Sequence, residues 1–331
     1  MTEDDEKTPY AQLGPDQILD AVEGAGYPCD GHLLALNSYE NRVYQVGLDG
    51  AVPVVVKFYR PGRWSDDAIL EEHRFTLELA ELEIPVVAPI VDPEGVTLHR
   101  HGPFRFALYP RRGGRAPDLE DPGQLEQLGR FVARIHGLGA VQPYRHRPSV
   151  DVENFGVESY QYLLESGFIP HDLELAYRSL AEDLIVRIRA CYARAGAVAR
   201  IRLHGDCHPG NILWTDDGPH IVDFDDARTG PAVQDLWMFL SGDRAFMTAR
   251  LADLMEGYTE FHSFDPRELH LIEALRTLRM LHYAAWIGRR WDDPAFPRAF
   301  PWFAGGRYWE EHILSLREQA ALMDEPPPVW S

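Results

Sequence analysis

The sequence predicts an α+β fold of two lobes, in which a small β-rich lobe is followed by a larger, mainly helical one. Three observations carry this prediction. Strand-like runs such as Val54-Val55-Val56 dominate the first hundred residues, with one long helical pattern among them. The segment from Pro110 to Gly114, which contains two arginines and two glycines, then interrupts the pattern. After it, apolar residues recur at the three- and four-residue spacing of an amphipathic helix.

The first lobe is expected to span residues 1–110. Its first 12 or so residues are expected to be disordered, and a short helix begins at Pro15, a residue suited to the first helical turn. Asp49-Gly50 is a strong hairpin signal between two strands. Ser65 is an expected N-cap for a helix that ends near residue 83. Strands are expected over residues 33–36, 42–48, 53–59, 96–99 and 104–109.

The second lobe is expected to span residues 111–331. Helices are expected around the apolar face of Leu125, Leu128, Val132 and Ile135, near residues 157–166 and 174–195, and over most of the chain after Pro231. Two short strands between these helices run directly into acidic residues. This is the pattern of a buried strand that delivers a carboxylate to a pocket.

Composition limits the class of protein. The chain has 331 residues, of which 45% are hydrophobic and 25% charged, which is ordinary for a globular protein with two cores. The acidic start of the chain is the opposite of a signal peptide, and an odd count of three cysteines suggests no disulfide framework, so a cytoplasmic location is expected. A net charge of -20 and the lack of a long apolar run argue against nucleic acid and membrane as partners.

The candidate chemistry lies in two acidic stretches. Leu203 to Asn211 contains His204 and Asp206, and Asn211 follows that aspartate by five residues. Ile221-Val222 then leads into Asp223. An aspartate that positions a hydroxyl nucleophile, followed by an asparagine and an aspartate that hold Mg²⁺ on ATP, is the set used in kinase-type phosphoryl transfer. Asp206 and Asn211 could instead be ordinary loop-capping residues, but the order and spacing of the set favour the catalytic interpretation.

Lysine usage supports the same chemistry. Only two of the 32 basic residues are lysines, Lys7 and Lys57. Lys57 ends a strand, from which a compact ammonium can bind the phosphates of ATP. In the helix that follows, Glu71 or Glu72 can pair with this lysine, and Glu72 is favoured because adjacent helical residues point about 100° apart. The alternatives are a lysine placed by chance and a solvated acidic helix face.

Other features shape this interpretation. Asn37 to Asn41 occupies the turn where a glycine-rich phosphate loop would stand, and the Ser38 hydroxyl could still contact phosphate. Only seven residues separate Asp223 from Pro231, too few for a long activation segment. His204, Cys207 and His208 are spaced too tightly for a zinc site, so His204 and also His136 are interpreted as structural. Asp235 is expected to anchor backbone amides of the loop.

The order of these residues resembles a protein-kinase-like fold. The loop from His204 to Asn211 and the later Asp223 resemble the His-x-Asp-x-x-x-x-Asn motif and metal-binding aspartate of the aminoglycoside phosphotransferase and choline kinase-like superfamily. A closer resemblance is to the bacterial stress response kinase A family. It rests on the stretches Leu36–Tyr44, Val56–Pro61, Ile69–His73, Leu203–Trp214, Gly230–Met238 and Asp293–Pro297.

The resemblance implies an ATP- and Mg²⁺-dependent serine/threonine protein kinase that is cytoplasmic, monomeric and active in stress response. It implies Asp206 as the proton acceptor, Asn211 and Asp223 as magnesium ligands, and Ser38 as part of the ATP site. Two alternatives stay open. The chain could phosphorylate a small molecule such as an amino alcohol or a sugar, or it could bind nucleotide without catalysis, although the complete catalytic set argues against the latter.

Overall fold

The computed structural model describes residues 9–330, which form two compact units. The first contains the described chain up to Pro117 together with Arg145–Arg147 and Gly210–Asp225, and the second contains the rest. The first unit is built on an antiparallel sheet and the second is mainly helical, so the predicted α+β class is confirmed. Because two later segments join the first unit, one cut in the sequence does not describe these units. The division into lobes at 110/111 stays a prediction.

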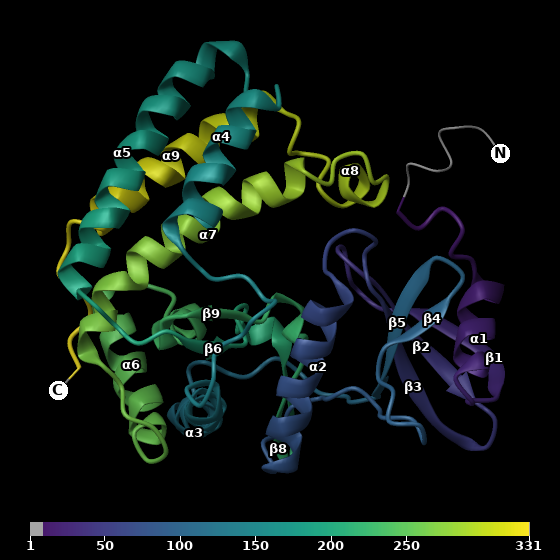
Figure 1. Cartoon of the computed structure of the whole chain (residues 1–331). Helices are drawn as coiled ribbons and strands as arrows, with labels where there is room; N and C mark the ends of the chain where they lie inside the picture. The colour runs from purple at the N-terminus through teal and green to yellow at the C-terminus, as the bar shows by residue number, and fades with distance from the viewer. Residues whose placement is uncertain (1–8, 331) are drawn as a thin grey trace. The chain divides into compact units, whose positions relative to one another are not determined.

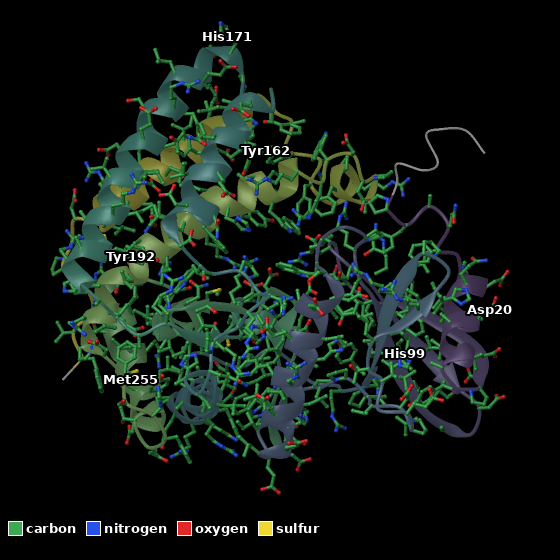
Figure 2. All side chains as sticks on the ribbon, viewed as in Figure 1. Asp20, His99, Tyr162, His171, Tyr192 and Met255 are labelled. Carbon is green, nitrogen blue, oxygen red and sulfur yellow. The ribbon has the colours of Figure 1, made fainter. Side chains whose placement is uncertain are left out.

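The first unit has a five-stranded antiparallel sheet of order β1-β2-β3-β5-β4. Its elements are α1 (Pro15–Gly24), β1 (Cys29–Ala35), β2 (Arg42–Leu48), β3 (Ala51–Phe58), α2 (Asp66–Glu81), β4 (His99–His101), β5 (Phe104–Pro110), β7 (Ile212–Thr215) and β8 (Gly218–Ile221). Helix α1 lies along one side of the sheet (Figure 1). It turns Ile18 and Val22 into the core, whereas Asp20 is exposed at the outer surface (Figure 2).

The two faces of the sheet serve different purposes. Side chains alternate along a strand, so the sequence of β3 places Val54, Val56 and Phe58 on one face and Val55 and Lys57 on the other. The first set is buried in the core that α1 covers. Val55 and Lys57 line a cavity on the opposite face. Because side chains alternate along β3, Lys57 points into the cavity on one face of the sheet while the opposite face is packed in the core.

The hairpin of β7 and β8 is part of the first unit. Ile221 donates its backbone N–H to Pro85 O at 2.8 Å and accepts one from Val87 N at 2.9 Å. Arg115 and Trp214 exchange two backbone hydrogen bonds, of 3.0 and 2.7 Å. Arg115, which directly follows the break predicted over residues 110–114, is therefore paired with a strand. These bonds fix the hairpin against the sheet unit.

The second unit consists of helices around a two-stranded ladder. Its elements are α3 (Pro122–Gly139), α4 (Glu158–Glu165), α5 (His171–Ala195), β6 (Ile201–Leu203), β9 (Arg228–Gly230), α6 (Arg244–Tyr258), α7 (Ile272–Gly288), α8 (Ala295–Ala299) and α9 (Gly306–Leu322). Helix α4 packs on α7, and α5 packs on α9 and α7 (Figure 1). Short 3₁₀ turns of this unit cover Ala232–Asp235, Trp237–Phe239 and Pro266–Leu271, and a π turn covers Glu153–Val157. Two further 3₁₀ turns, Pro209–Asn211 and Phe224–Asp226, stand where the chain passes between the two units.

Helices α3 and α6 cross with their backbones in contact. A Cβ on Gly129 would collide with the Leu254 carbonyl, and a Cβ on Gly257 would collide with the Glu126 carbonyl. Nearby, the Met255 side chain of α6 is fully buried (Figure 2). These two glycines thus allow the backbones of α3 and α6 to touch, and the contact holds α3, which carries His136, in place.

The structure corrects some sequence expectations. Residues 1–8 of the expected disordered tail lie outside the described residues, but Tyr10 is buried and donates hydrogen bonds to Phe58 O at 3.2 Å and Glu40 O at 3.3 Å. A single aromatic residue was too weak a signal against the polar stretch around it. The fourth strand begins at His99 rather than near residue 96. Over residues 9–330, no helix has both the length and the apolar character needed to cross a membrane.

Candidate active site

A cavity of about 320 Å³ lies in the first unit. Five of the six predicted site residues line it: Ser38, Lys57, Glu72, Asn211 and Asp223. Apolar side chains from the sheet and the hairpin form the rest of the walls, among them Leu36, Val43, Val55, Val87, Leu213 and Val222. The cavity therefore has an apolar part that suits a flat ring and a charged part that suits phosphates.

Lys57 is buried and held between carboxylates. Its Nζ lies 3.0 Å from Asp223 Oδ1 and 3.3 Å from Asp225 Oδ1. Burial by itself would lower the pKa of this amine, but the carboxylates of Asp223, Asp225 and Glu72 outweigh burial and hold the pKa well above its usual value. Lys57 is therefore a permanent positive charge in the cavity.

Asp225 extends this charge network. Its side chain is buried and pairs with the guanidinium of Arg63, and its backbone carbonyl accepts a hydrogen bond from Arg147. The guanidinium groups of Arg63 and Arg147 lie 4.9 and 4.2 Å from the centroid of the Trp64 ring, within the range of cation–π contacts. Asp225 stands two residues after Asp223 in the sequence, but no local pattern marks a role for it or for Arg63 and Arg147.

The structure separates the roles of the two adjacent glutamates of α2. Glu71 accepts backbone hydrogen bonds from Arg145, His146 and Arg147 at 2.6, 2.8 and 3.0 Å, so it anchors that segment. Glu72 lines the cavity instead, and burial raises its pKa to about 7 even though Lys57 and Arg147 act in the opposite direction.

The expected ion pair between Lys57 and Glu72 is not formed. Among the described residues, Lys57 pairs with the two aspartates, while Glu72 acts on the lysine only through its field. The prediction that Glu72 rather than Glu71 faces the site agrees with the lining of the cavity. The prediction that Glu72 pairs directly with Lys57 does not agree with the structure. The competing aspartates of the hairpin segment explain the difference, because they are closer to the ammonium.

The turn between β1 and β2 contributes Ser38. Its hydroxyl donates to Asn41 O at 3.1 Å and so closes the turn, while Asn41 Oδ1 accepts the backbone N–H of Arg60 at 3.1 Å. Side-chain hydrogen bonds thus do here what glycine conformations do in a glycine-rich loop. The hydroxyl lies at the cavity wall with its acceptor lone pairs still able to bond.

Asp223 has an unusual backbone conformation. Its φ of 62° lies in the left-handed region, which aspartate tolerates better than most residues. Its side chain is 54% exposed, in contrast to the buried Asp225. A strained backbone at a residue that lines a cavity is typical of a functional site.

Asn211 and Asp223 provide a donor set that fits magnesium. Asn211 closes the 3₁₀ turn Pro209–Asn211, and its backbone carbonyl accepts the N–H of Val222 at 3.0 Å, so the residue is tied to the strand that leads into Asp223. Magnesium prefers oxygen ligands and is usually held by one or two protein groups together with phosphate oxygens and water. Over residues 9–330, no cluster of three His, Cys, Asp or Glu side chains forms a dedicated metal cage.

The sixth predicted residue, Asp206, belongs to the second unit and follows strand β6. The loop that carries it is anchored by Asp235, whose carboxylate accepts the backbone N–H groups of His204 and Gly205, both at 2.8 Å. The expectation that Asp235 anchors loop amides is thus confirmed. Gly205 has φ 86°, and a Cβ there would collide with the Asp226 carbonyl, so only glycine fits.

Histidines complete this support. His136 Nε2 lies 3.3 Å from Asp235 Oδ2, and its Nδ1 is 2.8 Å from the Tyr258 hydroxyl. His204 is fully buried and its Nδ1 accepts the N–H of Asp206 at 3.3 Å. Both histidines are structural, as the sequence indicated. The thiol of Cys207 is buried, and burial raises its pKa well above the usual value.

Asp206 itself has charged neighbours. Its Oδ1 pairs with the guanidinium of Arg279, from α7, and its Oδ2 lies 3.6 Å from His208 Nε2. Arg279 lies 73 residues away in the sequence, so only a view of the folded chain identifies it.

The fold and the cavity define a class of protein, a kinase-like phosphotransferase that uses a nucleotide. A model of the "Phosphotransferase enzyme family" matches residues 32–272. A protein of Escherichia coli named "Stress response kinase A" is 45% identical over 318 residues, 96% of each chain. One of Salmonella typhimurium named "Serine/threonine protein kinase RdoA" is 43% identical over the same share. The chain belongs to this phosphotransferase family, within its stress response kinase A group.

A solved structure of an amicoumacin kinase in complex with AMP-PNP is similar in fold. It has a TM-score of 0.71 at 17% identity, and the match covers 93% of each chain. At that identity the likeness concerns the fold alone. It confirms the kinase-like α+β fold that the sequence predicted.

Proposed function

We propose that the chain is an ATP- and magnesium-dependent serine/threonine protein kinase that acts in a stress response. The observation that carries the proposal is the cavity of the first unit, where a permanently charged lysine and the oxygen donors Asn211 and Asp223 line one space beside an apolar wall. These are the groups that ATP bound through magnesium requires.

Each residue has a proposed role. The apolar wall binds the adenine ring, and the Ser38 hydroxyl contacts a phosphate oxygen. Lys57 is the cation for the α- and β-phosphates, and the buried Glu72 adjusts the field around it. Asn211 and Asp223 hold magnesium, which when bound neutralises phosphate charge.

Asp206 is the proposed catalytic base. The acceptor oxygen forms a bond to the γ-phosphorus while the bond from that phosphorus to the bridging oxygen of ADP breaks. The hydroxyl proton passes to Asp206, and ADP leaves. The Asp235 anchor keeps the loop in place, so Asp206 acts from a backbone that is already ordered.

We further propose that the phosphate acceptor is a serine or threonine of a protein. It is supported by the 43% identical relative whose name gives serine/threonine protein kinase activity. Coverage of 96% of each chain means that this relative aligns along the unit that carries Asp206 as well as along the cavity unit. A cytoplasmic location is part of the proposal, because ATP is its co-substrate, and the monomeric state is carried over from the family resemblance.

The test is a transfer assay with labelled ATP and magnesium. The protein is incubated alone, with a generic protein substrate, and with a panel of small alcohols. Label on protein serine or threonine is the expected result, and Asp206→Ala is the matched negative control. Turnover with a small alcohol and none with protein would exclude the protein-kinase proposal.

One observation favours a second candidate, a small-molecule kinase. The residues between Asp223 and Pro231 are fully used by the 3₁₀ turn Phe224–Asp226 and by β9, which pairs with β6. No length remains there for a segment that docks an extended peptide. The small-alcohol arm of the same assay tests this candidate.

A further inference from the structure

Arg279 is the one charged group of α7 that contacts the proposed base. In the part of the chain that the structure describes, Asp206 is its one ion-pair partner. The Arg279 side chain is 38% exposed and that of Asp206 is 23% exposed. A partly exposed ion pair of this kind contributes only modestly to stability. Its position on the reacting carboxylate therefore suggests a role in the reaction rather than in the fold.

The face of α7 around Arg279 is cationic and aromatic. Tyr283 and Trp286 follow at four and seven residues, which places them on the same face of the helix. Their rings stack with centroids 5.7 Å apart, and Tyr283 is 41% exposed. Just past the helix end, the Arg290 guanidinium lies over Trp286, 5.2 Å from the ring centroid.

The carboxylate of α7 lies elsewhere. Glu273 is the only acidic residue of the helix, it is buried, and it is paired with Arg244 and Arg276 and accepts a hydrogen bond from Gln319. On this face α7 therefore presents a guanidinium and no carboxylate of its own, in a chain whose net charge is -20. A guanidinium that can exchange one carboxylate partner for another selects its ligand by charge.

We propose that Arg279 recognises an acidic side chain next to the acceptor serine or threonine, so that the enzyme prefers acidic segments of its protein substrate. The inference rests on the proposed protein-kinase function and names the substrate class of that site. The proposed substrate segment is negatively charged, whereas the acidic composition of the chain alone would favour a positively charged substrate.

The exchange of partners gives the mechanism. While Arg279 pairs with Asp206 Oδ1, that oxygen is engaged and less able to accept a hydroxyl proton. A carboxylate of the incoming segment offers the guanidinium an equivalent partner, so Asp206 is released at the moment that the acceptor hydroxyl arrives. A basic segment offers no such exchange and is repelled by the same guanidinium. One residue thus controls both the binding of the segment and the availability of the base.

The experiment compares three matched serine peptides that carry aspartate, alanine or arginine at the flanking positions. For the unmodified chain we expect kcat/KM to be about tenfold to a hundredfold higher with aspartate than with alanine, the size of a charge-assisted hydrogen bond. Arg279→Ala should remove most of this preference through a higher KM for the aspartate peptide and a higher kcat for the alanine peptide, because Asp206 Oδ1 is no longer engaged by a guanidinium. Arg279→Lys should restore part of it.

Arg289→Ala is the matched control. Arg289 caps the C-terminal end of α7, and its guanidinium is directed to Glu158 O and the Tyr162 ring, so the loss of its charge should leave the preference intact. A serine-to-alanine version of the aspartate peptide should inhibit the unmodified chain competitively and Arg279→Ala much less.

The outcomes are distinct. Phosphorylation of all three peptides at equal efficiency, or a preference that Arg279→Ala leaves unchanged, would overturn the inference while the protein-kinase function stands. Turnover of small alcohols with no label on any peptide would overturn both. Circular dichroism and thermal melting of each variant separate loss of recognition from loss of fold, and Arg279→Lys provides the answer if Arg279→Ala does not fold.

Discussion

The cavity of the first unit and the loop of the second hold their reactive carboxylates in different ways. In the cavity, Asp223 and Lys57 are held by other charges, because Asp225, Arg63 and Glu72 all belong to one network. In the loop, Asp206 is carried by a backbone whose amides are bound to Asp235. Where charges hold a site together, a mutation is expected to change the stability of the fold and its pH dependence as well as turnover. A site held by its backbone confines that effect to turnover.

The largest effect that we expect separates the two regions directly. Asp206→Ala should reduce phosphoryl transfer by about three to four orders of magnitude, because it removes the proton acceptor. The melting temperature should stay close to that of the unmodified chain, because the loop anchors are backbone groups. Transfer assays and thermal melting measure the two quantities, with Asp172→Ala, an exposed aspartate at the start of α5, as the control. A large fall in stability would show that the loop depends on its own side chain.

The next prediction concerns Asp223. Asp223→Asn should lower turnover by about a thousandfold, through weaker magnesium binding and a misplaced lysine, and should raise the magnesium concentration needed for half-maximal rate. Asparagine tolerates the left-handed backbone, so strain does not confuse the result. Asp216→Ala, at the exposed tip of the same hairpin, should be neutral. An unchanged magnesium requirement would contradict the assignment.

The third prediction uses the adjacent glutamates. Glu71→Gln weakens an acceptor shared by three backbone amides, so the free energy of unfolding should fall by about 2 kcal/mol at any pH near neutrality. Glu72→Gln should behave differently. Because burial holds the pKa of Glu72 near 7, above its ordinary value of about 4.3, the folded chain binds more protons than the unfolded chain between these values.

It follows that Glu72 makes the unmodified chain lose stability as the pH rises from about 4.3 to 7, and that Glu72→Gln removes this loss. The variant should therefore gain about 2 to 3 kcal/mol relative to the unmodified chain between pH 5 and pH 8, while it loses activity. Urea denaturation at the two pH values measures the difference. If the difference in the free energy of unfolding between the two proteins were the same at both pH values, the pKa of Glu72 would not be raised in the folded chain.

The smallest effect is expected at the β1–β2 turn. Ser38→Ala removes one hydrogen bond to Asn41 O and one phosphate contact, which should raise KM for ATP about fivefold, with kcat little changed. Steady-state kinetics in ATP tests this. Ser166→Ala, whose hydroxyl bonds Leu163 O at the end of α4, is a control of equal chemistry in the other unit. A fall in kcat alone would indicate that the turn acts on the transition state.

Much of the molecule could be predicted because its signals are local. The alternation of β3, the Ser65 cap, whose hydroxyl accepts the N–H of Ala68 at 3.2 Å, and the loop spacing from Asp206 to Asn211 are all written in neighbouring residues. What sequence reasoning missed is set by contacts between distant residues. Arg63 and Asp225 are 162 positions apart, and Arg279 and Asp206 are 73 positions apart. No spacing rule connects such pairs.

The partner of Lys57 shows the same limit. The helix period indicated that only one of the two adjacent glutamates can face the site, which agrees with the roles that the structure gives them. It carried no information on how close the hairpin brings Asp223 and Asp225. Competition between carboxylates for one ammonium is decided by distances that the sequence does not contain.

The scarcity of lysine also affects what can be done to the protein. Reagents and enzymes that acylate or couple to lysine need an accessible amine in its neutral form. Lys57 is 6% exposed and its pKa is well above the usual value, so it offers neither. The other lysine of the sequence is Lys7. Amine-directed cross-linking and lysine acetylation should therefore leave the folded core unmarked, whereas arginine-directed reagents should modify it at many positions.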